Sequence, residues 1–538
     1  MAMKTSTSVK LSTAIVLLLS IMFYHSEVVA QEVTFANDIA PIIYKNCTTC
    51  HRQGEIGPMP FTSYDEISAW GSMLNEVIQS NYMPPWPPSK EYSRFSNERG
   101  LTDDEKSLIA EWIENEMPRG DISLEPEVPQ FPTGSQIGTP DLILTMEEAF
   151  QHSGNGNDEY RVFVLPTGLT EDREIAAIEL RPGNATIVHH ALFSYDTSGE
   201  ARNLDQQDSE YGYDGFGGFG IDEAFTRQFP GYVPGQDPYI YPNTLGKTLP
   251  AGSDLLIQMH YGPVYTDQLD QSTVNIFFKD EPVERQVREF IMLPFEFSGT
   301  QMDKPFFIPA NQVETFHGQY TTPIDASILS IAPHMHLLGK SWEVYIEHID
   351  GSLTNVIQVP DWDFNWQGTY NFPRFIVAEQ GATIHAIATY DNTIDNPVNP
   401  NSPPQFVTWG EKTTDEMYYL PISFVPYNVG DEDIIFDNSV TSISNVHLEK
   451  ELTHLDHPYP NPSSDHIEIG FTLSVDQRAH LELRAIDGKL IKTAIDSKLY
   501  AKGKHLHQMR VDDVQQGTYL VVLSTESGEV RTQTITIN

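Results

Sequence analysis

The sequence contains only two cysteines, Cys47 and Cys50, among its 538 residues. A disulfide framework needs more cysteines than this, so the domains should be stabilised by hydrophobic cores. The two thiols are therefore available for another task. Positive charge is also scarce, because 32 Lys and Arg residues oppose 75 Asp and Glu residues for a formal charge of −43. Nucleic acids and anionic membrane surfaces would repel such a chain, and we expect neither as a partner.

Long apolar runs are missing after the N-terminal region. The candidate run, Leu11–Phe23, follows Lys4 and Lys10 and precedes the small residue Ala30. This pattern predicts a cleavable signal peptide over residues 1–30. A membrane anchor is the alternative, but the run is shorter than the ~20 residues that a spanning helix needs. We therefore expect an exported protein without membrane insertion, located in the periplasm, on the cell surface or in the medium.

The first segment of the expected mature chain, residues 31–120, has helical periodicity. One helix is expected after a capping box of Ser63 and Glu66, and another after a box of Thr102 and Glu105. The apolar residues expected on one face of the first helix are Ile67, Trp70, Leu74, Val77 and Ile78. The pattern predicts a small all-α domain.

From residue 141 onward, short β-type runs alternate with clusters of Gly, Pro, Asn and Asp. Examples are Arg161–Leu165, Leu255–Met259, Ser341–Ile346 and Thr518–Leu523. Such runs predict jelly-roll-like β-sandwiches in a multidomain protein. The expected segments are a linker at 121–140, β-sandwiches at 141–283 and 284–430, a second linker at 431–454, and a small C-terminal β-sandwich at 455–538.

Residues 47–51 form a CxxCH motif, in which Cys47 and Cys50 can bond the vinyl groups of a haem while His51 ligates the iron. The alternatives are a redox disulfide and half of a zinc site, but the chain has no second cysteine pair and no surrounding thioredoxin-like pattern. Met83 is favoured over Met59 as the sixth ligand, because the prolines that follow it would hold its thioether rigidly. The arrangement resembles class I cytochrome c domains and implies a covalently bound haem c.

Six side chains in the two large predicted sandwiches have the types and spacing of metal ligands. They are His189, His190, His260, His334, His336 and Met417. Adjacent residues of a regular strand face opposite sides, so His189 and His190 could share an ion only at a bulge or a strand end. His334 and His336 would share one strand face and could reach one ion. Taken singly, each residue could equally be an ordinary core side chain.

In order and context, these six residues resemble the copper type II, ascorbate-dependent monooxygenases, the family of peptidylglycine α-hydroxylating monooxygenase and dopamine β-monooxygenase. The resemblance covers residues 141–430. It implies one copper held by the first three histidines and a second, catalytic copper held by His334, His336 and Met417. The aromatic segment Trp362–Gln367 also looks like the family, and we expect it to pack in the core.

The ligand types suit the implied chemistry. Hydroxylating a C–H bond with O2 takes two electrons, each copper stores one, and the soft thioether of Met417 favours Cu(I). We therefore expect a secreted copper-dependent monooxygenase that acts on a small organic substrate and O2. Electrons would pass through the haem from an ascorbate-like reductant or a redox protein, because His/Met ligation raises the haem potential.

Two departures from the family limit the expected substrate. This chain has no disulfides in these domains, and Ala332 stands where the peptide-processing enzyme has a substrate-binding arginine. A peptidylglycine substrate is therefore not expected. The alternative functions are a non-catalytic haem and copper protein for electron transfer or copper binding, and a structural surface protein with relic ligands.

The C-terminal region contains the segment Pro458-Tyr459-Pro460-Asn461-Pro462 and ends in an alternating strand pattern. It resembles the type A sorting domain of type IX secretion. That resemblance implies an export signal without a catalytic role. The alternative is a small sandwich that binds carbohydrate or stabilises the chain.

Overall fold

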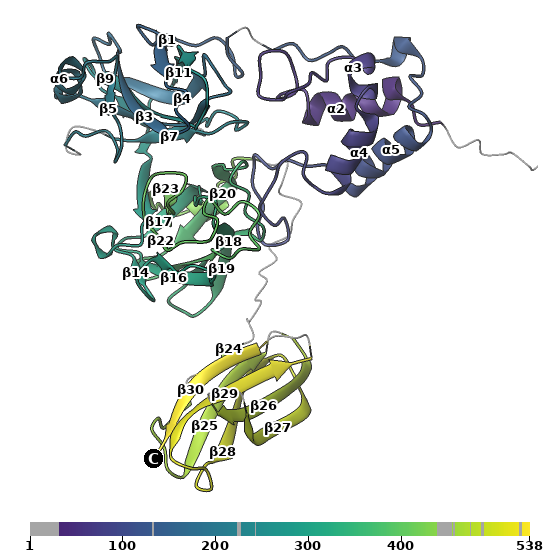
Figure 1. Ribbon diagram of the computed structural model, residues 1–538, viewed down its shortest axis with the longest axis vertical. Helices are drawn as coiled ribbons and strands as arrows, with labels where there is room; N and C mark the ends of the chain where they lie inside the picture. Colours follow the sequence, from purple (N-terminus) through teal and green to yellow (C-terminus); the bar gives the residue numbers. More distant parts are fainter. Residues whose placement is uncertain are drawn as a thin grey trace, which may run out of the picture.

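The computed structural model describes residues 32–131, 134–222, 227–242, 244–437, 454–455, 458–473, 475–485, 489–526 and 530–538. The predicted signal peptide and most of the second predicted linker lie outside these residues. The chain is mostly β, with several antiparallel sheets and a small N-terminal helical region, as its sequence pattern predicts (Figure 1). Within the described ranges, no helix is both long and apolar enough to cross a lipid bilayer.

The helical unit contains η1 (Phe35–Ile39), α2 (Ala40–Asn46), α3 (Tyr64–Ser68), α4 (Gly71–Gln79), α5 (Asp103–Glu114) and η2 (Ile122–Leu124). Helix α5 starts at the predicted capping box, in which Thr102 and Glu105 each accept a hydrogen bond from the other's backbone N–H. Ile109 and Trp112 of this helix are fully buried in the core of the unit.

The helix predicted after Ser63 is in fact two helices, α3 and α4. Ser63 accepts a hydrogen bond from the N–H of Glu66, but the Glu66 carboxylate accepts from Thr62 instead of closing the capping box. The break between the helices turns Trp70 away from the core and leaves it 38% exposed. The prediction that Trp70 lies on the buried face was therefore wrong. The residues of that face that are buried are Ile67, Leu74 and Ile78.

The first sandwich contains two five-stranded sheets, ordered β1-β11-β4-β8-β12 and β6-β3-β9-β5-β7, and the ribbon β10-β2. Its elements are β1 (Leu142–Thr145), β2 (Phe150–His152), β3 (Glu159–Pro166), β4 (Arg173–Arg181), β5 (Val188–Asp196), α6 (Glu200–Gln207), β6 (Tyr213–Asp214), β7 (Phe229–Tyr232), β8 (Leu245–Leu249), β9 (Asp254–Tyr261), β10 (Gln268–Asp270), β11 (Thr273–Phe278) and β12 (Arg285–Gln286). Strand β9 is buried along its whole length, because it pairs with β3 on one side and β5 on the other.

The second sandwich contains sheets ordered β13-β23-β17-β20 and β14-β16-β21-β18-β19, with the ribbon β15-β22. Its elements are β13 (Arg288–Met292), η4 (Glu296–Ser298), β14 (Gln301–Met302), β15 (Phe307–Ile308), β16 (Val313–Thr321), β17 (Ala326–Ile331), β18 (Gly339–Glu347), β19 (Leu353–Val359), β20 (Tyr370–Ala378), β21 (Thr383–Asp391), β22 (Val407–Thr408), β23 (Leu420–Pro426) and η5 (Asp431–Asp433). Phe436 packs on Phe375 beyond η5, so ordered packing continues past residue 430.

The C-terminal sandwich has a three-stranded sheet β24-β25-β28 and a four-stranded sheet β27-β26-β29-β30. Its strands are β24 (His454–Leu455), β25 (His466–Leu473), β26 (Gln477–Ala485), β27 (Leu490–Tyr500), β28 (Gly503–Arg510), β29 (Gly517–Thr525) and β30 (Val530–Ile537). The alternation predicted in β29 places Tyr519, Val521 and Leu523 in a core of its own. In Figure 1 this sandwich stands apart from the other units.

A segment of the helical unit, residues 84–97, packs on the second sandwich, and we call it the strap. Phe95 of the strap is fully buried in the core of that sandwich. Trp86 meets the ring of Tyr370 edge-on at 5.4 Å, and the N–H of Ser96 donates to the carbonyl of Asn371 at 2.8 Å. The strap therefore ties the CxxCH-containing unit to the second sandwich.

Candidate metal and haem sites

His189 and His190 lie at the start of β5, where the register with β9 shifts between Val188 and His190. This irregularity brings two adjacent side chains toward one place, which is what binding of a shared ion requires. His260, on β9, is the direct strand partner of His190. We call these residues the three-histidine group.

The three imidazoles of this group converge through their Nδ1 atoms. His190 Nδ1 lies 3.3 Å from His189 Nδ1 and 3.1 Å from His260 Nδ1. Two imidazole nitrogens bound to one tetrahedral ion at ~2.0 Å are about 3.3 Å apart, so the spacing fits a shared transition metal. Ligand atoms of all three residues lie within 4.8 Å of one another. The donor set therefore fits copper.

Asp158 fixes the orientation of His260. The Nε2–H of His260 donates to Asp158 Oδ1 at 2.8 Å, which leaves Nδ1 directed at the other two histidines. Tyr160 stacks on the same imidazole with ring centroids 4.2 Å apart. Asp158 also accepts a hydrogen bond from Thr413 of the second sandwich at 2.9 Å, so both sandwiches support this ligand.

His334 and His336 lie in the connection between β17 and β18, whereas a regular strand was predicted. His334 forms an isolated antiparallel bridge with Tyr419. The predicted alternation still holds, because Met335 between them is fully buried in the core and the two imidazoles lie 5.1 Å apart, centroid to centroid. The prediction of a strand was therefore wrong, but the prediction that the two imidazoles share one face was right.

Both of these imidazoles are held by their Nδ1 atoms. His334 Nδ1–H donates to Gln367 Oε1 at 2.5 Å, and His336 Nδ1–H donates to the carbonyl of Asp415 at 3.1 Å. Each Nε2 therefore remains for a metal, which is how metal-binding histidines are commonly oriented. We call His334, His336 and Met417 the His-Met group.

Met417 lies on the chain segment that runs beside His336. Glu416, which precedes Met417, is fully buried and accepts hydrogen bonds from the N–H groups of His336, Leu338 and Met417. Burial raises the pKa of Glu416 to about 8. The carboxyl group thus ties the His-x-His turn to the segment carrying the predicted thioether ligand.

The two candidate copper groups adjoin. The rings of His190 and His334 lie 6.2 Å apart, although they belong to different sandwiches. Phe364 stacks on His189 at 4.8 Å and meets His336 edge-on at 5.8 Å. Two one-electron centres at these groups would therefore be close neighbours.

Four histidines of these groups, His189, His190, His334 and His336, are held neutral by their surroundings. Burial, with a smaller effect of neighbouring imidazoles, lowers the pKa of His189 to about 4 and that of His336 to about 3. Burial likewise lowers the pKa of His334 to about 4 and that of His190 well below its ordinary value. Neutral imidazoles offer a lone pair, the form that binds a metal ion.

The CxxCH motif follows α2. Cys47 and Cys50 are free thiols in the structure, both partly buried. The Nδ1–H of His51 donates to the carbonyl of Met59 at 3.1 Å, and its ring stacks on Phe61 at 4.6 Å. Because Nδ1 is engaged, Nε2 remains for an iron ion. Two available thiols and an oriented imidazole fit covalent haem attachment.

The two methionines considered as the sixth ligand have different surroundings. Met59 packs against the apolar core of the helical unit. Met83 follows α4, its N–H donates to the carbonyl of Val77 at 3.0 Å, and the strap begins at the next residue. The assignment of Met83 as an iron ligand stays a prediction.

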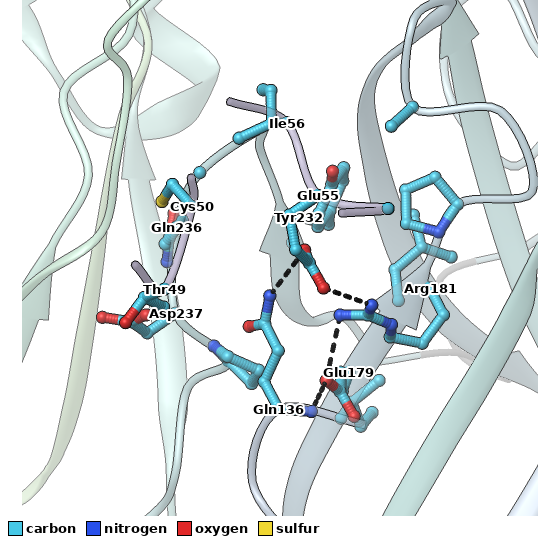
Figure 2. A pocket seen from close by; sticks show the side chains of 18 of the residues that line it. Thr49, Cys50, Glu55, Ile56, Gln136, Glu179, Arg181, Tyr232, Gln236 and Asp237 are labelled. Atoms are coloured by element: carbon cyan, nitrogen blue, oxygen red, sulfur yellow. Dashed lines mark hydrogen bonds and ion pairs between the residues drawn. The ribbon is translucent and has the colours of Figure 1, made fainter. Parts of the chain in front are cut away.

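The CxxCH loop faces the first sandwich across a space of about 750 Å³, part of it open to solvent (Figure 2). Glu55 of this loop pairs with Arg181 of β4 at 2.7 Å and with Arg52 at 2.8 Å. Gln136 joins the same network, because its backbone N–H donates to Glu179 at 2.6 Å. These ion pairs hold the loop that carries Cys50 against the first sandwich.

Several residues that support the candidate ligands were not predicted from the sequence. They are Asp158, Phe364, Gln367 and Glu416. The segment Trp362–Gln367 was expected in the core; Trp362 does pack there, whereas Phe364 and Gln367 face the histidines. Glu416 gave a usable signal, since a carboxyl group beside a predicted ligand is a frequent orienting partner. Asp158 gave none, because its partners are distant in the sequence.

Comparison with known proteins identifies the C-terminal region. Residues 457–538 match the family model described as the secretion system C-terminal sorting domain. The predicted sorting domain is therefore confirmed, and the protein is exported by type IX secretion to the cell surface or the medium. No match was found among curated proteins.

The solved structures that align with this chain include two β-glucuronidases, and both likenesses are distant. A β-glucuronidase of Faecalibacterium prausnitzii aligns at 9% identity over 43% of this chain and 38% of its own, with a TM-score of 0.14. A β-glucuronidase of Parabacteroides merdae aligns at 11% identity over 41% of this chain and 27% of its own, with a TM-score of 0.15. The chain thus spans less than two fifths of either enzyme, and these scores are too low to bear on fold or activity.

Proposed function

We propose that this chain is an exported copper-dependent monooxygenase that hydroxylates a C–H bond of a small organic substrate with O2 and receives electrons through a covalently bound haem. The observation that supports the proposal is the proximity of two candidate sets of ligand histidines from separate sandwiches, with the ring centroids of His190 and His334 6.2 Å apart. A storage protein has no need to bring two different donor sets together.

The three-histidine group would hold the copper that stores an electron. Three nitrogen donors support both Cu(I) and Cu(II). Asp158 and Tyr160 keep the imidazole of His260 in one orientation, so little rearrangement is needed when the charge of the ion changes.

The His-Met group would hold the copper at which O2 is reduced, and the soft sulfur of Met417 favours the Cu(I) state. Gln367 and Asp415 hold the two imidazoles with Nε2 outward. Phe364 contacts an imidazole of each group, because its ring stacks on His189 and meets His336 edge-on.

The haem would be held by Cys47, Cys50, His51 and Met83, and it would supply a one-electron reservoir. The Glu55–Arg181 ion pair and the strap support this role, because they join the helical unit to both sandwiches. An external reductant, either an ascorbate-like molecule or a redox protein, would supply the electrons.

The proposal is tested first by composition. The full chain, purified with haem attached and loaded with Cu(II), is expected to contain two coppers and one haem. Met417→Leu should retain the haem and at least one copper, but should lose the incorporation of one ¹⁸O atom from ¹⁸O2 into a product formed from a panel of small organic compounds with ascorbate as reductant. Met292→Leu is the matched control, because it makes the same change at another methionine of the second sandwich, one that lies in its core.

The outcomes separate the alternatives. Failure to bind copper overturns the proposal outright. Full copper and haem loading without ¹⁸O incorporation by the unaltered chain favours the non-catalytic electron-transfer or copper-binding alternative. Equal product formation by Met417→Leu and Met292→Leu removes the role assigned to the thioether.

A further inference from the structure

An aromatic contact links Tyr82, which precedes the predicted iron ligand Met83, to Trp366, which precedes the residue that holds His334. We propose that Tyr82, Trp366 and Gln367 form an electron path that ends at His334 and bypasses the three-histidine group. This inference rests on the proposed function and adds to it the copper that the haem reduces first.

The path begins beside Met83, the predicted iron ligand. Tyr82 precedes Met83 in the chain, and its ring lies 6.1 Å from the ring of Trp366, centroid to centroid, in an edge-on arrangement at 75°. Tyr82 belongs to the helical unit and Trp366 to the second sandwich. The ring contact therefore crosses the interface between these two units.

The path ends on a candidate copper ligand. Gln367 follows Trp366, and its Oε1 accepts the hydrogen bond from His334 Nδ1 at 2.5 Å. Between Met83 and His334 there are thus two peptide linkages, one ring contact and one hydrogen bond. A contiguous chain of such contacts is the physical requirement for coupling two centres through the protein.

Trp366 lies where the helical unit meets the second sandwich. Its ring lines a space of about 390 Å³, part of it open to solvent, that Trp86 and Gln236 also line. Its Nε1 is buried without a hydrogen-bond partner within the described part of the chain, as are those of Trp86 and Trp342. The ring therefore lies at the interface that the proposed path crosses.

The alternative path for the electron, through the space in Figure 2 to the three-histidine group, is less direct. Cys50 lines that space together with Phe193 and Tyr232 of the first sandwich. Phe193 stands three residues along β5 from His190, a separation of about 10 Å on an extended strand. Entry by this route would first cross the space and then follow the strand.

The proposed step moves one electron and no atoms. The haem iron, reduced by an external one-electron donor, goes from Fe(II) to Fe(III), and the copper of the His-Met group goes from Cu(II) to Cu(I). No bond forms or breaks, and no proton is transferred.

The test uses the full chain with haem attached and both coppers loaded as Cu(II), without O2 or substrate. A flash-generated flavin radical reduces the haem, and the return of the ferric haem absorbance reports electron transfer to copper. Tyr82→Leu and Trp366→Leu should each slow this return by about tenfold or more, whereas Trp366→Phe, which keeps a ring, should restore most of the rate. Tyr232→Leu, which alters the other space, should leave the rate unchanged.

Haem and copper contents are measured before the kinetics. An unaltered chain that lacks either cofactor counts against the proposed function, whereas unchanged rates in fully loaded Tyr82→Leu and Trp366→Leu overturn the path. Tyr82 is 50% exposed, so Tyr82→Leu should fold even if Trp366→Leu does not. If only Tyr232→Leu slows the return of the ferric haem absorbance, the electron enters at the three-histidine group, and this result would also overturn the path.

Discussion

At the scale of single residues, several candidate ligands depend on a partner that holds the imidazole in one orientation. His260 is held by Asp158, His334 by Gln367, and His51 by the carbonyl of Met59. In every case one ring nitrogen is engaged and the other is left for a metal. Asp158 and Gln367 are distant in the sequence from the histidines that they hold, so there the fold selects the nitrogen that is offered.

Asp158 provides the residue-scale prediction. Asp158→Asn should weaken copper binding to the three-histidine group by about 10–100-fold, because a ligand loses its charged orienting partner. The measurement is a competition titration of the Cu(I)-loaded full chain against a chelator. Asp395→Asn, a change of the same kind at an exposed position, should bind copper as the unaltered chain does. Equal affinities in the two variants would contradict the orienting role.

At the scale of secondary-structure elements, an ion pair and a hydrogen bond to the same carboxylate join three elements. Asp431 of η5 accepts two hydrogen bonds from Arg285 of β12, both at 2.7 Å, and one from Ser327 of β17 at 2.5 Å. Burial alone would raise the pKa of Asp431, but the hydrogen bonds from Arg285 and Ser327 outweigh it and hold the pKa below its ordinary value. The carboxylate therefore stabilises the junction in its charged form.

The sign of the pH dependence follows from this lowered pKa. The contribution of Asp431 is fully present above its ordinary pKa of 3.8 and is lost as the pH falls through the lower folded-state value. Asp431→Asn should reduce the free energy of unfolding at pH 7 by about 3–5 kcal/mol, since it leaves Arg285 without its buried counter-charge. Urea unfolding should show the difference from the unaltered chain shrinking toward pH 3. Asp433→Asn, at an exposed neighbour, should behave as the unaltered chain at both pH values.

At the scale of the whole molecule, the export domain and the remaining units are built separately. The C-terminal sandwich has its own core, and in Figure 1 it stands apart from the units that carry the candidate ligands. The helical unit, in contrast, shares the strap with the second sandwich and an ion pair with the first. Removing the C-terminal sandwich should therefore change location and leave the candidate sites intact.

A chain that ends at Asp437 provides the whole-molecule prediction. It should fold, and bind haem and copper as the full chain does, but it should remain inside the cell envelope because the sorting domain at residues 457–538 is missing. Cell fractionation with immunoblotting measures the location, and metal analysis of the purified chain measures the sites. Recovery of the shortened chain from the medium at the level of the full chain would refute the export role.

The sequence by itself determined the features that depend on local spacing. The capping box at Thr102 and Glu105, the alternating strand around Val521 and the sorting domain follow from periodicity and short motifs, and all three are confirmed. The sequence also indicated that His189 and His190 could share an ion only at a bulge or a strand end, and the register of β5 does shift between Val188 and His190. The haem and copper assignments stay predictions.

Only the tertiary structure decided the features that depend on how the units meet. The proximity of His190 to His334, the strap that buries Phe95 in another unit, and the contact of Tyr82 with Trp366 all join segments far apart in the chain. Helical or strand periodicity indicates which side of an element is apolar, but it does not indicate which neighbouring element covers that side. For the same reason Trp70 was misplaced, since a helix break changes the face without changing the spacing of apolar residues.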